Sequence, residues 1–454
     1  MADETRILSK FAADLTYDRI PASILARVID LIVDQIGVEI GCSELPWAKQ
    51  VRDTCRSTGG VSEATVVRYG DRLPAASAAY INSTFGHSFE YDEGNPLIHG
   101  HLGSELVPSL LAISERDRLS GKDFLTAFVA AYEVRGRISW AVSPDMVQRG
   151  GPQYSTSCGP FGVAAGVAKL LKLDAEGICN ALGIAGAFSG GLMQYDQGGG
   201  SVKRIYTAIA ASSGIQAAHL AQAGMSGPEG ILEGPRGLLR IYASSYRPER
   251  LIPDVEKRWM IDTMYFKPYC VVGIIAAAID GLRKIMTEHS LKADDIAAVE
   301  VGYPKGYPLH AGGTAPHDIL SLQFSTSYSL ALTVLKGQNT PRVYTMESLA
   351  DPAIRAFSTK VTVVEDTELT RLYEGKLPAR VSVRTTAGHT HEAVVIEAKG
   401  SAGNPLTRDE VDDKFRAQVA DIFGASRCEG LIQMLRNIEK MDNMAQLASL
   451  LVLT

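Results

Sequence analysis

The segment Phe161-Gly162-Val163-Ala164-Ala165-Gly166-Val167-Ala168 is rich in small residues, and a second such segment, Ala181-Leu182-Gly183-Ile184-Ala185-Gly186-Ala187, follows it. Each glycine inside a helix costs about 1 kcal/mol relative to alanine. That cost is offset where small side chains let two backbones approach closely, so residues 157–190 predict a buried helix pair. Three charged residues, Lys169, Lys172 and Asp174, interrupt the apolar run and argue against a membrane span.

Helical patterns continue on both sides of this pair. Apolar residues such as Ile24, Val28 and Leu31 recur at helical spacing within residues 20–42. Further helices are predicted at 75–88, 109–116 and 205–224, and after Ser120, which forms a capping box with Asp123. The first 265 residues are therefore predicted to be almost wholly α-helical.

The pattern changes near residue 290. Four segments have the β-branched content and partial alternation of strands, and they span residues 296–303, 360–365, 379–386 and 391–399. Helical stretches lie among them at 271–288 and 322–336, and Thr407-x-x-Glu410 caps a return to helices. The predicted fold is mainly α: an all-α domain formed by residues 1–265 and completed by 404–454, plus a smaller α+β lid domain at 266–403.

Size and composition exclude several classes of protein. The chain has 454 residues and a formal net charge of −6, and it contains no long run of Lys and Arg, so we expect no nucleic-acid partner. Its six cysteines form no Cys-x-x-Cys pair, which indicates reduced thiols without a zinc site. The acidic N-terminus lacks the apolar core of a signal peptide, and no apolar run is long enough for a membrane span. We therefore expect a cytoplasmic globular protein.

Residues 85–108 concentrate groups that can perform acid–base chemistry. Three of the nine histidines, His87, His99 and His101, lie here, together with the acids Glu90, Asp92, Glu93 and Glu105. Gly94-Asn95-Pro96 breaks the helical period, so these groups are predicted on a loop that can direct a carboxylate and an imidazole into one cleft. The alternative is an ordinary polar surface loop. The His99-x-His101 spacing also permits a metal ligand pair, but this spacing is common by chance, and we expect no metal.

Basic residues elsewhere suggest an anion site. Lys203 and Arg204 follow a glycine run and precede an Ala-rich helix, where they form either an anion site or a solvated pair. Lys267 marks the junction of the proposed domains, a favoured place for ligand clefts. Tyr328 lies in an apolar helix, where a tyrosine is usually part of the core. No phosphate-binding or dinucleotide-binding motif has the required spacing, so no cofactor is expected.

The loop acids Glu90-Tyr91-Asp92-Glu93, followed by His101 and Pro108, resemble the Asp-Phe-Asp-Asp-Thr…His-Pro segment of the MmgE/PrpD family. The likeness continues in order along nearly the whole chain, through Phe161-Gly162, Ala181-Leu182-Gly183, Val202-Lys203-Arg204, Gly227-Pro228, Phe266-Lys267-Pro268-Tyr269, Phe324-Ser325 and Asn404-Pro405. The family includes 2-methylcitrate dehydratase, cis-aconitate decarboxylase and iminodisuccinate epimerase. The resemblance implies an all-α domain with a smaller α+β lid, commonly in a homodimer.

The resemblance also implies site residues. His101 matches the loop histidine of the family, and Asp92 matches the second loop acid. Lys203 and Lys267 match its two lysines, and Tyr328 matches its tyrosine. On this basis His101 is expected to be the general base, Asp92 its orienting partner, and Tyr328 a proton donor.

The chain departs from the family pattern at several positions, including Tyr206 and Ala276, each of which replaces a His of the family. Glu90 stands where Asp is usual, Gly94 replaces the Thr, and Gln153 replaces a second His. Glutamine cannot accept a proton, so a second acid–base role passes to Tyr154, Tyr328, a lysine or His101 itself. We expect Gln153, Tyr154 and Glu90 to contact the substrate.

These observations predict an enzyme, independent of metals and cofactors, that abstracts a proton α to a carboxylate of a small di- or tricarboxylic acid. Lys203, Arg204 and Lys267 are expected to bind the carboxylates and to stabilise the charge that develops. The reaction is that of a lyase similar to 2-methylcitrate dehydratase or of an isomerase similar to iminodisuccinate epimerase. The alternative is a catalytically degenerate family member that binds carboxylates without turnover.

Overall fold

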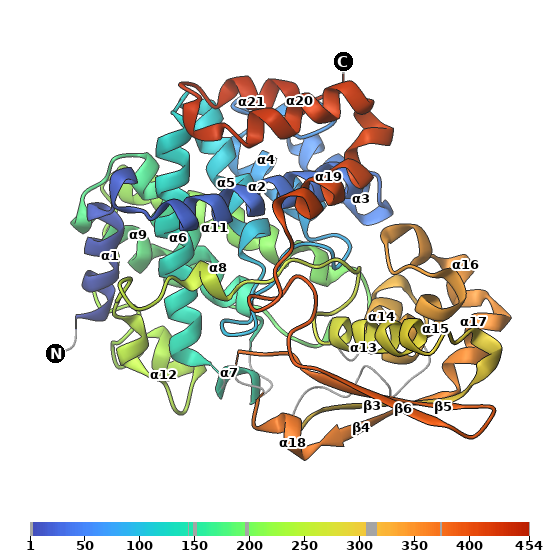
Figure 1. Ribbon diagram of the computed structural model, residues 1–454. Helices are drawn as coiled ribbons and strands as arrows, with labels where there is room; N and C mark the ends of the chain where they lie inside the picture. Colours follow the sequence, from blue (N-terminus) through green and yellow to red (C-terminus); the bar gives the residue numbers. More distant parts are fainter. Residues whose placement is uncertain are drawn as a thin grey trace.

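The computed structural model describes residues 3–143, 145–148, 152–195, 199–305, 316–372 and 375–453. Its fold is mainly α with a smaller α+β part, as predicted, and the two parts lie side by side (Figure 1). The larger part is built from α1 (Glu4–Asp14), α2 (Ala22–Cys42), α3 (Pro46–Thr58), α4 (Ala75–Gly86), α5 (Leu102–Arg116), α6 (Gly121–Val142), α7 (Asp145–Gln148), α8 (Tyr154–Leu170), α9 (Ala175–Ala185), α11 (Tyr206–Gln222) and α12 (Leu238–Tyr242).

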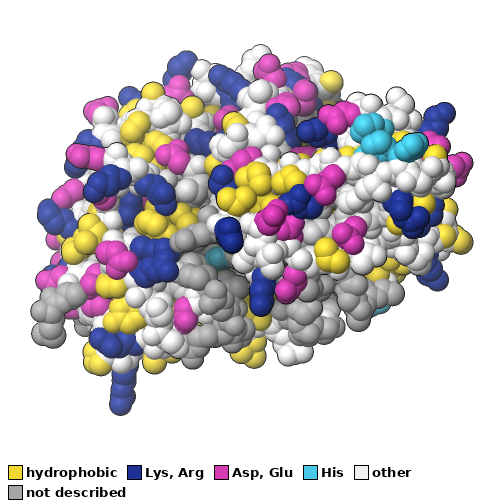
Figure 2. Space-filling model, turned by 60° about the horizontal axis from the view of Figure 1, so that its bottom comes forward, with side chains coloured by type: hydrophobic (Ala, Val, Ile, Leu, Met, Phe, Trp, Pro, Cys, Tyr) yellow, Lys and Arg dark blue, Asp and Glu magenta, His cyan; other side chains and the backbone are white. Residues whose placement is uncertain are grey.

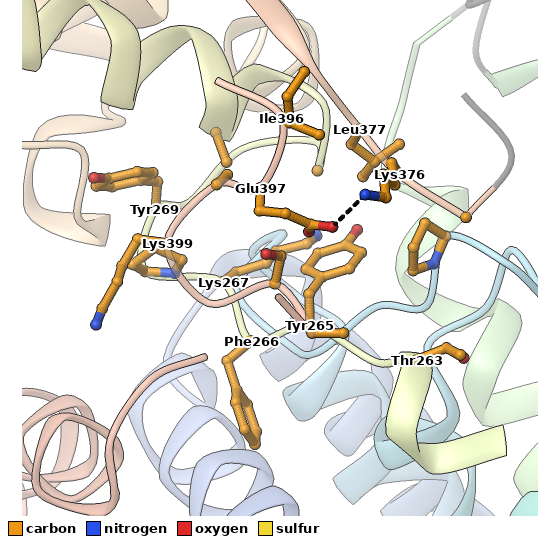
Figure 3. Close-up of a pocket in the computed structure, with 18 of the residues that line it drawn as sticks. Thr263, Tyr265, Phe266, Lys267, Tyr269, Lys376, Leu377, Ile396, Glu397 and Lys399 are labelled. Atoms are coloured by element: carbon orange, nitrogen blue, oxygen red, sulfur yellow. Dashed lines mark ion pairs between the residues drawn. The ribbon is translucent and has the colours of Figure 1, made fainter. Parts of the chain in front are cut away.

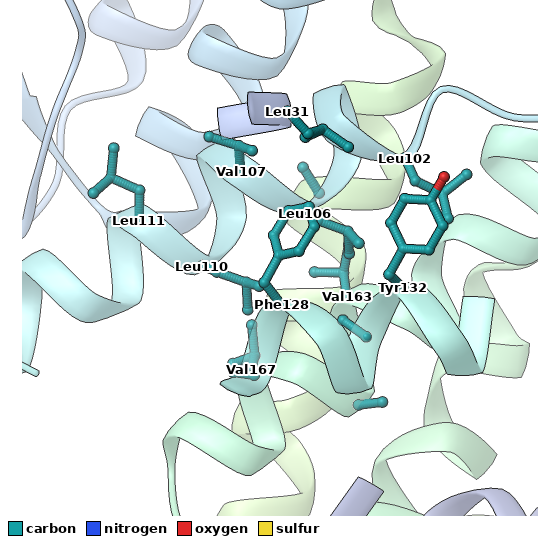
Figure 4. Packing of buried hydrophobic residues seen from close by; sticks show 14 of the residues in the cluster. Leu31, Leu102, Leu106, Val107, Leu110, Leu111, Phe128, Tyr132, Val163 and Val167 are labelled. Carbon is teal, nitrogen blue, oxygen red and sulfur yellow. The ribbon is translucent and has the colours of Figure 1, made fainter. Parts of the chain in front are cut away.

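Close helix packing organises this larger part. A side chain at Gly166 would meet Ala131 Cβ at 2.8 Å, and one at Gly214 would meet Val163 Cβ at 2.4 Å. The glycines therefore let α8 approach α6 and α11 closely, so the close approach expected of small residues is found, but between α8 and helices outside residues 157–190. Figure 4 shows Leu106, Phe128 and Val163, from α5, α6 and α8, meeting in the core between these helices.

The smaller part is a four-stranded sheet with helices around it. Its strands are β3 (Ile296–Pro304), β4 (Val361–Asp366), β5 (Ala379–Thr385) and β6 (Thr390–Val395), in the order β4-β3-β5-β6. Only the β3–β4 pair is parallel among these neighbours. The helices of this part are α13 (Ile275–Glu288), α14 (Ile319–Gln323), α15 (Thr326–Lys336), α16 (Met346–Ala350), α17 (Pro352–Ser358) and α18 (Thr367–Thr370).

The chain ends with α19 (Arg408–Phe423), α20 (Ala425–Leu435) and α21 (Ala445–Leu450), and α19 packs on α2 (Figure 1). Buried side chains of these last helices share one hydrophobic cluster with the helices before residue 266. A second cluster joins the sheet, α13 and α15, and it also includes Phe89 and Tyr91 of the 85–108 segment. The two clusters thus meet at that segment.

Four local expectations were wrong in detail. Helix α5 starts at Leu102 and contains Pro108, because burial of its apolar face outweighs the one main-chain hydrogen bond that proline cannot make. The stretch 322–336 divides into α14 and α15, since the Ser325 side chain accepts from Tyr328 N and starts a new helix. Strand β6 ends at Val395, before the expected residue 399. A two-residue strand pair, β1 (Ala64–Thr65) with β2 (Arg72–Leu73), interrupts the helical part.

The surface is mixed in charge. On the face in Figure 2, Lys and Arg side chains alternate with Asp and Glu, and no large area carries one sign alone. Within the described residues, no helix combines the length and the apolar character needed to cross a membrane.

Candidate active site

Several hydrogen bonds fix the position of the loop between α4 and α5. Gly94 and Tyr265 exchange two main-chain hydrogen bonds, of 3.0 and 2.8 Å, and Asn95 N donates to Gly100 O at 3.1 Å. The Lys414 ammonium of α19 donates to Tyr91 O at 2.7 Å. The loop is therefore a fixed, buried element between the two parts of the molecule, which rules out the surface-loop alternative.

Three side chains of this loop form what we call the histidine trio: His87, Asp92 and His101. Asp92 Oδ2 lies 2.7 Å from His87 Nδ1 and 3.3 Å from His101 Nδ1. It also accepts from Ser104 Oγ at 2.7 Å. The two imidazole rings are 4.7 Å apart between centroids. One carboxylate thus orients both rings.

The hydrogen bonds assign the proton on each ring. His101 Nδ1 lies 2.7 Å from Glu93 O, and both this carbonyl and Asp92 are acceptors, so Nδ1 carries the proton. In the neutral ring, Nε2 of His101 then carries the lone pair, and the side chain is 18% exposed whereas His87 and Asp92 are fully buried. His101 is therefore the accessible base of the trio, as a catalytic base must be.

His87 links the trio to the basic residues. Its Nε2 lies 3.3 Å from the Lys203 ammonium, a donor, so Nε2 accepts and Nδ1 donates to Asp92. Burial and the neighbouring Lys203 lower the pKa of His87 to about 3, so the ring is neutral. Burial raises the pKa of Asp92, but His101 and His87 outweigh it and hold that pKa well below its ordinary value.

The second group, which we call the lysine cluster, consists of Glu90, Lys203, Arg204 and Lys267. Glu90 Oε1 accepts a short hydrogen bond from Lys203 Nζ, and Oε2 accepts from Lys267 Nζ at 2.9 Å. Arg204 Nη1 lies 3.6 Å from Glu90 Oε1, while Arg204 Nη2 donates to Gln323 Oε1 at 2.9 Å. All four side chains are buried.

Burial and charge oppose each other in this cluster. Burial would raise the pKa of Glu90, but Lys203 and Lys267 together hold it well below its ordinary value. Burial lowers the pKa of Lys203 in spite of Glu90, whereas for Lys267 the opposite charge of Glu90 prevails over burial and raises the pKa. Lys203 is therefore the better proton donor of the two lysines.

Three buried polar atoms of the site have no hydrogen-bond partner among the described residues: Arg204 Nη1, Asp92 Oδ1 and Glu93 Oε2. An unpaired buried donor is costly and calls for an explanation, and an anionic ligand is one that fits the cationic setting. Next to the cluster, a small cavity of about 40 Å³ is lined by Tyr265, Lys267 and the Lys376–Glu397 ion pair (Figure 3).

The histidine trio is also the one group in the described part of the chain whose ligand atoms lie close enough to hold a metal ion, within 4.8 Å of one another. Its chemistry does not favour a cation. Both Nδ1 atoms already donate to acceptors, and the Lys203 ammonium adjoins His87. The expectation of a metal-free site stays a prediction that this geometry supports.

Six of the predicted site residues come together: Glu90, Asp92, His101, Lys203, Arg204 and Lys267. Three others make their described contacts elsewhere. Gln153 caps α8, with Oε1 accepting from Thr156 N at 3.0 Å, and the hydroxyl of Tyr154 lies 3.0 Å from Ser143 Oγ. Tyr328 is buried in the second hydrophobic cluster. Their roles toward a substrate stay predictions.

His87 is a site residue that the sequence reasoning did not select. It ends α4 as the C-cap, and its two partners, Asp92 and Lys203, are 5 and 116 positions away. The local signal was a histidine placed directly before the acidic motif. The link to Lys203 has no local signal.

Comparison with known proteins gives matches along almost the whole chain. The model of the MmgE/PrpD N-terminal domain matches residues 6–251, and that of the MmgE/PrpD C-terminal domain matches residues 269–440. The cis-aconitate decarboxylase-like protein oryM of Aspergillus oryzae is 27% identical over 98% of this chain and 97% of its own length. The cis-aconitate decarboxylase of Aspergillus terreus is 24% identical over 98% and 95%, and that of Homo sapiens is 26% identical over 84% and 80%.

Proposed function

Because this chain belongs to the MmgE/PrpD family, we propose that it is a lyase acting on a small di- or tricarboxylic acid, by a mechanism that forms negative charge α to a carboxylate. Relatives named cis-aconitate decarboxylase support the lyase class. The observation that carries the proposal is the combination of an accessible imidazole nitrogen, His101 Nε2, with a buried cationic cluster in which one donor, Arg204 Nη1, has no hydrogen-bond partner among the described residues.

The steps follow from the proton positions. Arg204 and the lysines hold a substrate carboxylate, which makes the neighbouring C–H bond more acidic because the carbanion charge spreads into that carboxylate. His101 Nε2 takes the proton, and Asp92 and Glu93 O stabilise the ring through Nδ1–H. Fixed cations in a buried site stabilise the developing charge more strongly than water does.

Completion of the reaction requires a proton donor. The Lys203 ammonium, with its lowered pKa, suits this role, and His87 orients it. In a dehydration, the Lys203 proton converts the departing hydroxide to water. In a decarboxylation, the bond between the carboxylate and the α-carbon breaks, carbon dioxide leaves, and the electron pair of that bond stays on the α-carbon. Lys203 then delivers its proton to this carbon. Either reaction fits the same arrangement of His101, Lys203 and Arg204.

Epimerisation of an amino- or iminodicarboxylate is the second candidate. It needs removal of an α-proton and its return to the opposite face, with no leaving group. The observation in its favour is the residue at 153, where the family pattern has an imidazole and this chain has a helix-capping glutamine. A homodimer and a cytoplasmic location accompany both candidates as predictions, and light scattering tests the first.

One experiment separates the candidates. The protein is incubated in heavy water with 2-methylcitrate, cis-aconitate or iminodisuccinate and followed by proton NMR. A new alkene or loss of carbon dioxide supports the lyase, and α-deuteration with inversion supports the epimerase. The His101→Asn variant keeps a donor toward Asp92 and removes the base, so it should bind but not exchange. Exchange by that variant at the wild-type rate would overturn the assignment of His101.

A further inference from the structure

We propose that Glu39, Gln35 and Ser104 are positioning residues for Asp92, in a chain where each side chain donates a hydrogen bond to the next and Ser104 donates to Asp92. We call these four residues the carboxylate chain, and all four are buried. The inference rests on the proposed function, because there Asp92 orients the base His101. It is carried by three contacts: Asp92 Oδ2 to Ser104 Oγ at 2.7 Å, Ser104 Oγ to the Gln35 amide at 3.1 Å, and this amide to Glu39 Oε1 at 3.1 Å.

The Ser104 hydroxyl has a single proton, and both Asp92 and the Gln35 amide lie within reach of it. Asp92 is ionised, because its pKa lies well below the ordinary value, and its Oδ2 is the nearer atom. A charged acceptor forms a stronger hydrogen bond than a neutral one. The hydroxyl proton therefore points to Asp92, and Ser104 Oγ faces Gln35 as an acceptor.

This proton position determines which end of the Gln35 amide faces Ser104. With the amide oxygen 3.1 Å from Ser104 Oγ, two acceptors would face each other without a proton between them. A half-turn about the terminal bond of the side chain exchanges the oxygen and the NH2 group, and the amide then donates to Ser104. The amide oxygen now lies next to Glu39, so Glu39 must carry a proton for this contact to be favourable.

The surroundings of Glu39 favour the protonated form. Burial raises the pKa of Glu39 to about 8, in spite of its contact with the Gln35 amide. The ionisable groups on the elements packed against α2 interact with other partners: Lys414 of α19 with Asp34, Arg436 of α20 with Asp30, Arg135 of α6 with Glu105 of α5, Asp262 of the turn 260–263 with Arg27, and His87 at the end of α4 with Asp92. Glu39 therefore keeps its proton at neutral pH.

The carboxylate chain acts on one oxygen of Asp92. His87, His101 and Ser104 all reach Oδ2, whereas Oδ1 has no hydrogen-bond partner among the described residues. A carboxylate held at one oxygen is free to rotate, and the Ser104 hydrogen bond restricts this rotation so that Oδ2 stays near His101. An ionised Glu39 would attract the amide NH2, turn the amide oxygen toward Ser104, and compete with Asp92 for the hydroxyl proton.

The pH profile of kcat distinguishes this positioning role from simple packing. In the wild type, kcat should fall above about pH 8, where Glu39 ionises. Glu39→Gln still donates to the Gln35 amide and cannot ionise, so its kcat, relative to its own maximum, should persist to higher pH. Profiles of the same shape for both proteins would overturn the proposal.

Ser104→Ala removes the link to Asp92. Because the lost hydrogen bond is made to a charged group, kcat should fall by about tenfold. In the Ser104→Ala background, Glu39→Gln should no longer change the shape of the pH profile, since the two residues act through the same chain. An undiminished effect of Glu39→Gln in that background would contradict the chain. If Ser104→Ala does not fold, the comparison of wild type with Glu39→Gln decides.

Ser114→Ala is the matched control. Ser114 lies on the same helix, α5, is fully buried, and its hydroxyl has no hydrogen-bond partner among the described residues. The variant removes the same group outside the carboxylate chain, so it should retain the wild-type kcat and pH profile. An equal loss of kcat in Ser114→Ala would assign the effect of Ser104→Ala to the packing of α5 and would overturn the role of its hydrogen bond.

Infrared spectroscopy tests the proton on Glu39 without any substrate. The difference between wild type and Glu39→Gln at pH 7 should contain the C=O band of a protonated carboxyl group. Gln35→Met, which removes the acceptor, should shift this band to higher frequency. If no substrate is turned over, the lyase assignment fails, and a band with this shift still supports the carboxylate chain. Absence of the band, or a band that Gln35→Met does not move, would overturn the chain even for an active lyase.

Discussion

The helical part of the molecule contains another buried ion cluster, which is more completely paired than the lysine cluster. Arg135 and Glu105 are both fully buried, with Arg135 Nε and Nη2 donating to the two carboxylate oxygens at 3.0 and 3.2 Å. Arg135 also donates to Ser139 Oγ and to Tyr154 O. Every donor nitrogen of this guanidinium is used.

The lysine cluster is equally buried but incompletely paired. Arg204 Nη1 has no hydrogen-bond partner among the described residues, cations exceed carboxylates, and the bridging Glu90 has a strained backbone. The difference teaches that buried charge alone does not identify a functional site. Donors without hydrogen-bond partners, excess charge of one sign and an adjacent cavity are together the features on which we propose that the lysine cluster is functional, because a purely structural ion pair gains stability by being complete.

The largest expected effect separates the two clusters by activity. Lys203→Met should lower turnover by about 100- to 1,000-fold, because the site loses a preorganised cation and its proton donor. The fold should survive, since Glu90 keeps its bond to Lys267. Measurement of kcat on a substrate identified by NMR, with the midpoint of thermal unfolding, tests both statements.

Arg135→Met is the matched change in the complete cluster. It leaves Glu105 as an unpaired buried charge, and the free energy of unfolding should fall by about 3–5 kcal/mol. Molecules that remain folded should retain their kcat. If Arg135→Met lowered kcat as strongly as Lys203→Met without loss of stability, the division into structural and functional clusters would be wrong.

The two clusters also show which features of the molecule the sequence can predict. Small-residue helices and β-branched strands are local patterns, so they predicted the fold class and most elements. Matching residue types along the chain predicted His101, Lys203 and Lys267. The bridging position of Glu90 depends on the packing of segments more than 100 residues apart, and the capping role of Gln153 depends on where α8 starts. Neither leaves a local pattern that sequence reasoning could use.

An intermediate effect concerns acid stability, because the lysine cluster adjoins a buried neutral histidine, His87. The folded pKa of His87 is about 3 and the ordinary value is 6.5. Below pH 6.5, His87 therefore binds a proton in the unfolded chain but not in the folded chain. The free energy of unfolding falls progressively between pH 6.5 and about 3. His87→Asn, which can still donate to Asp92, should flatten this part of the profile.

Other groups titrate in the same range, so the difference between the two proteins is the quantity to measure. Burial lowers the pKa of His99 to about 4, which adds to the loss in acid. Burial raises the pKa of Glu133 to about 7, which acts in the opposite direction because its contribution is lost as the pH rises. Urea unfolding at pH 7 and pH 5 for wild type and His87→Asn isolates the His87 contribution. Parallel profiles would mean that His87 is not held neutral.

The smallest effect is expected at Gln153, which the family pattern suggested as a substrate contact. In the structure its side-chain oxygen caps α8, and loss of a helix cap costs about 1 kcal/mol. Gln153→Ala should lower the free energy of unfolding by that amount and leave kcat and KM unchanged, while Gln153→Asn, which still offers a cap acceptor, should retain most of the stability. A rise in KM for both variants, with stability lost only in Gln153→Ala, would instead place the Gln153 amide against the substrate and extend the functional cluster as far as α8.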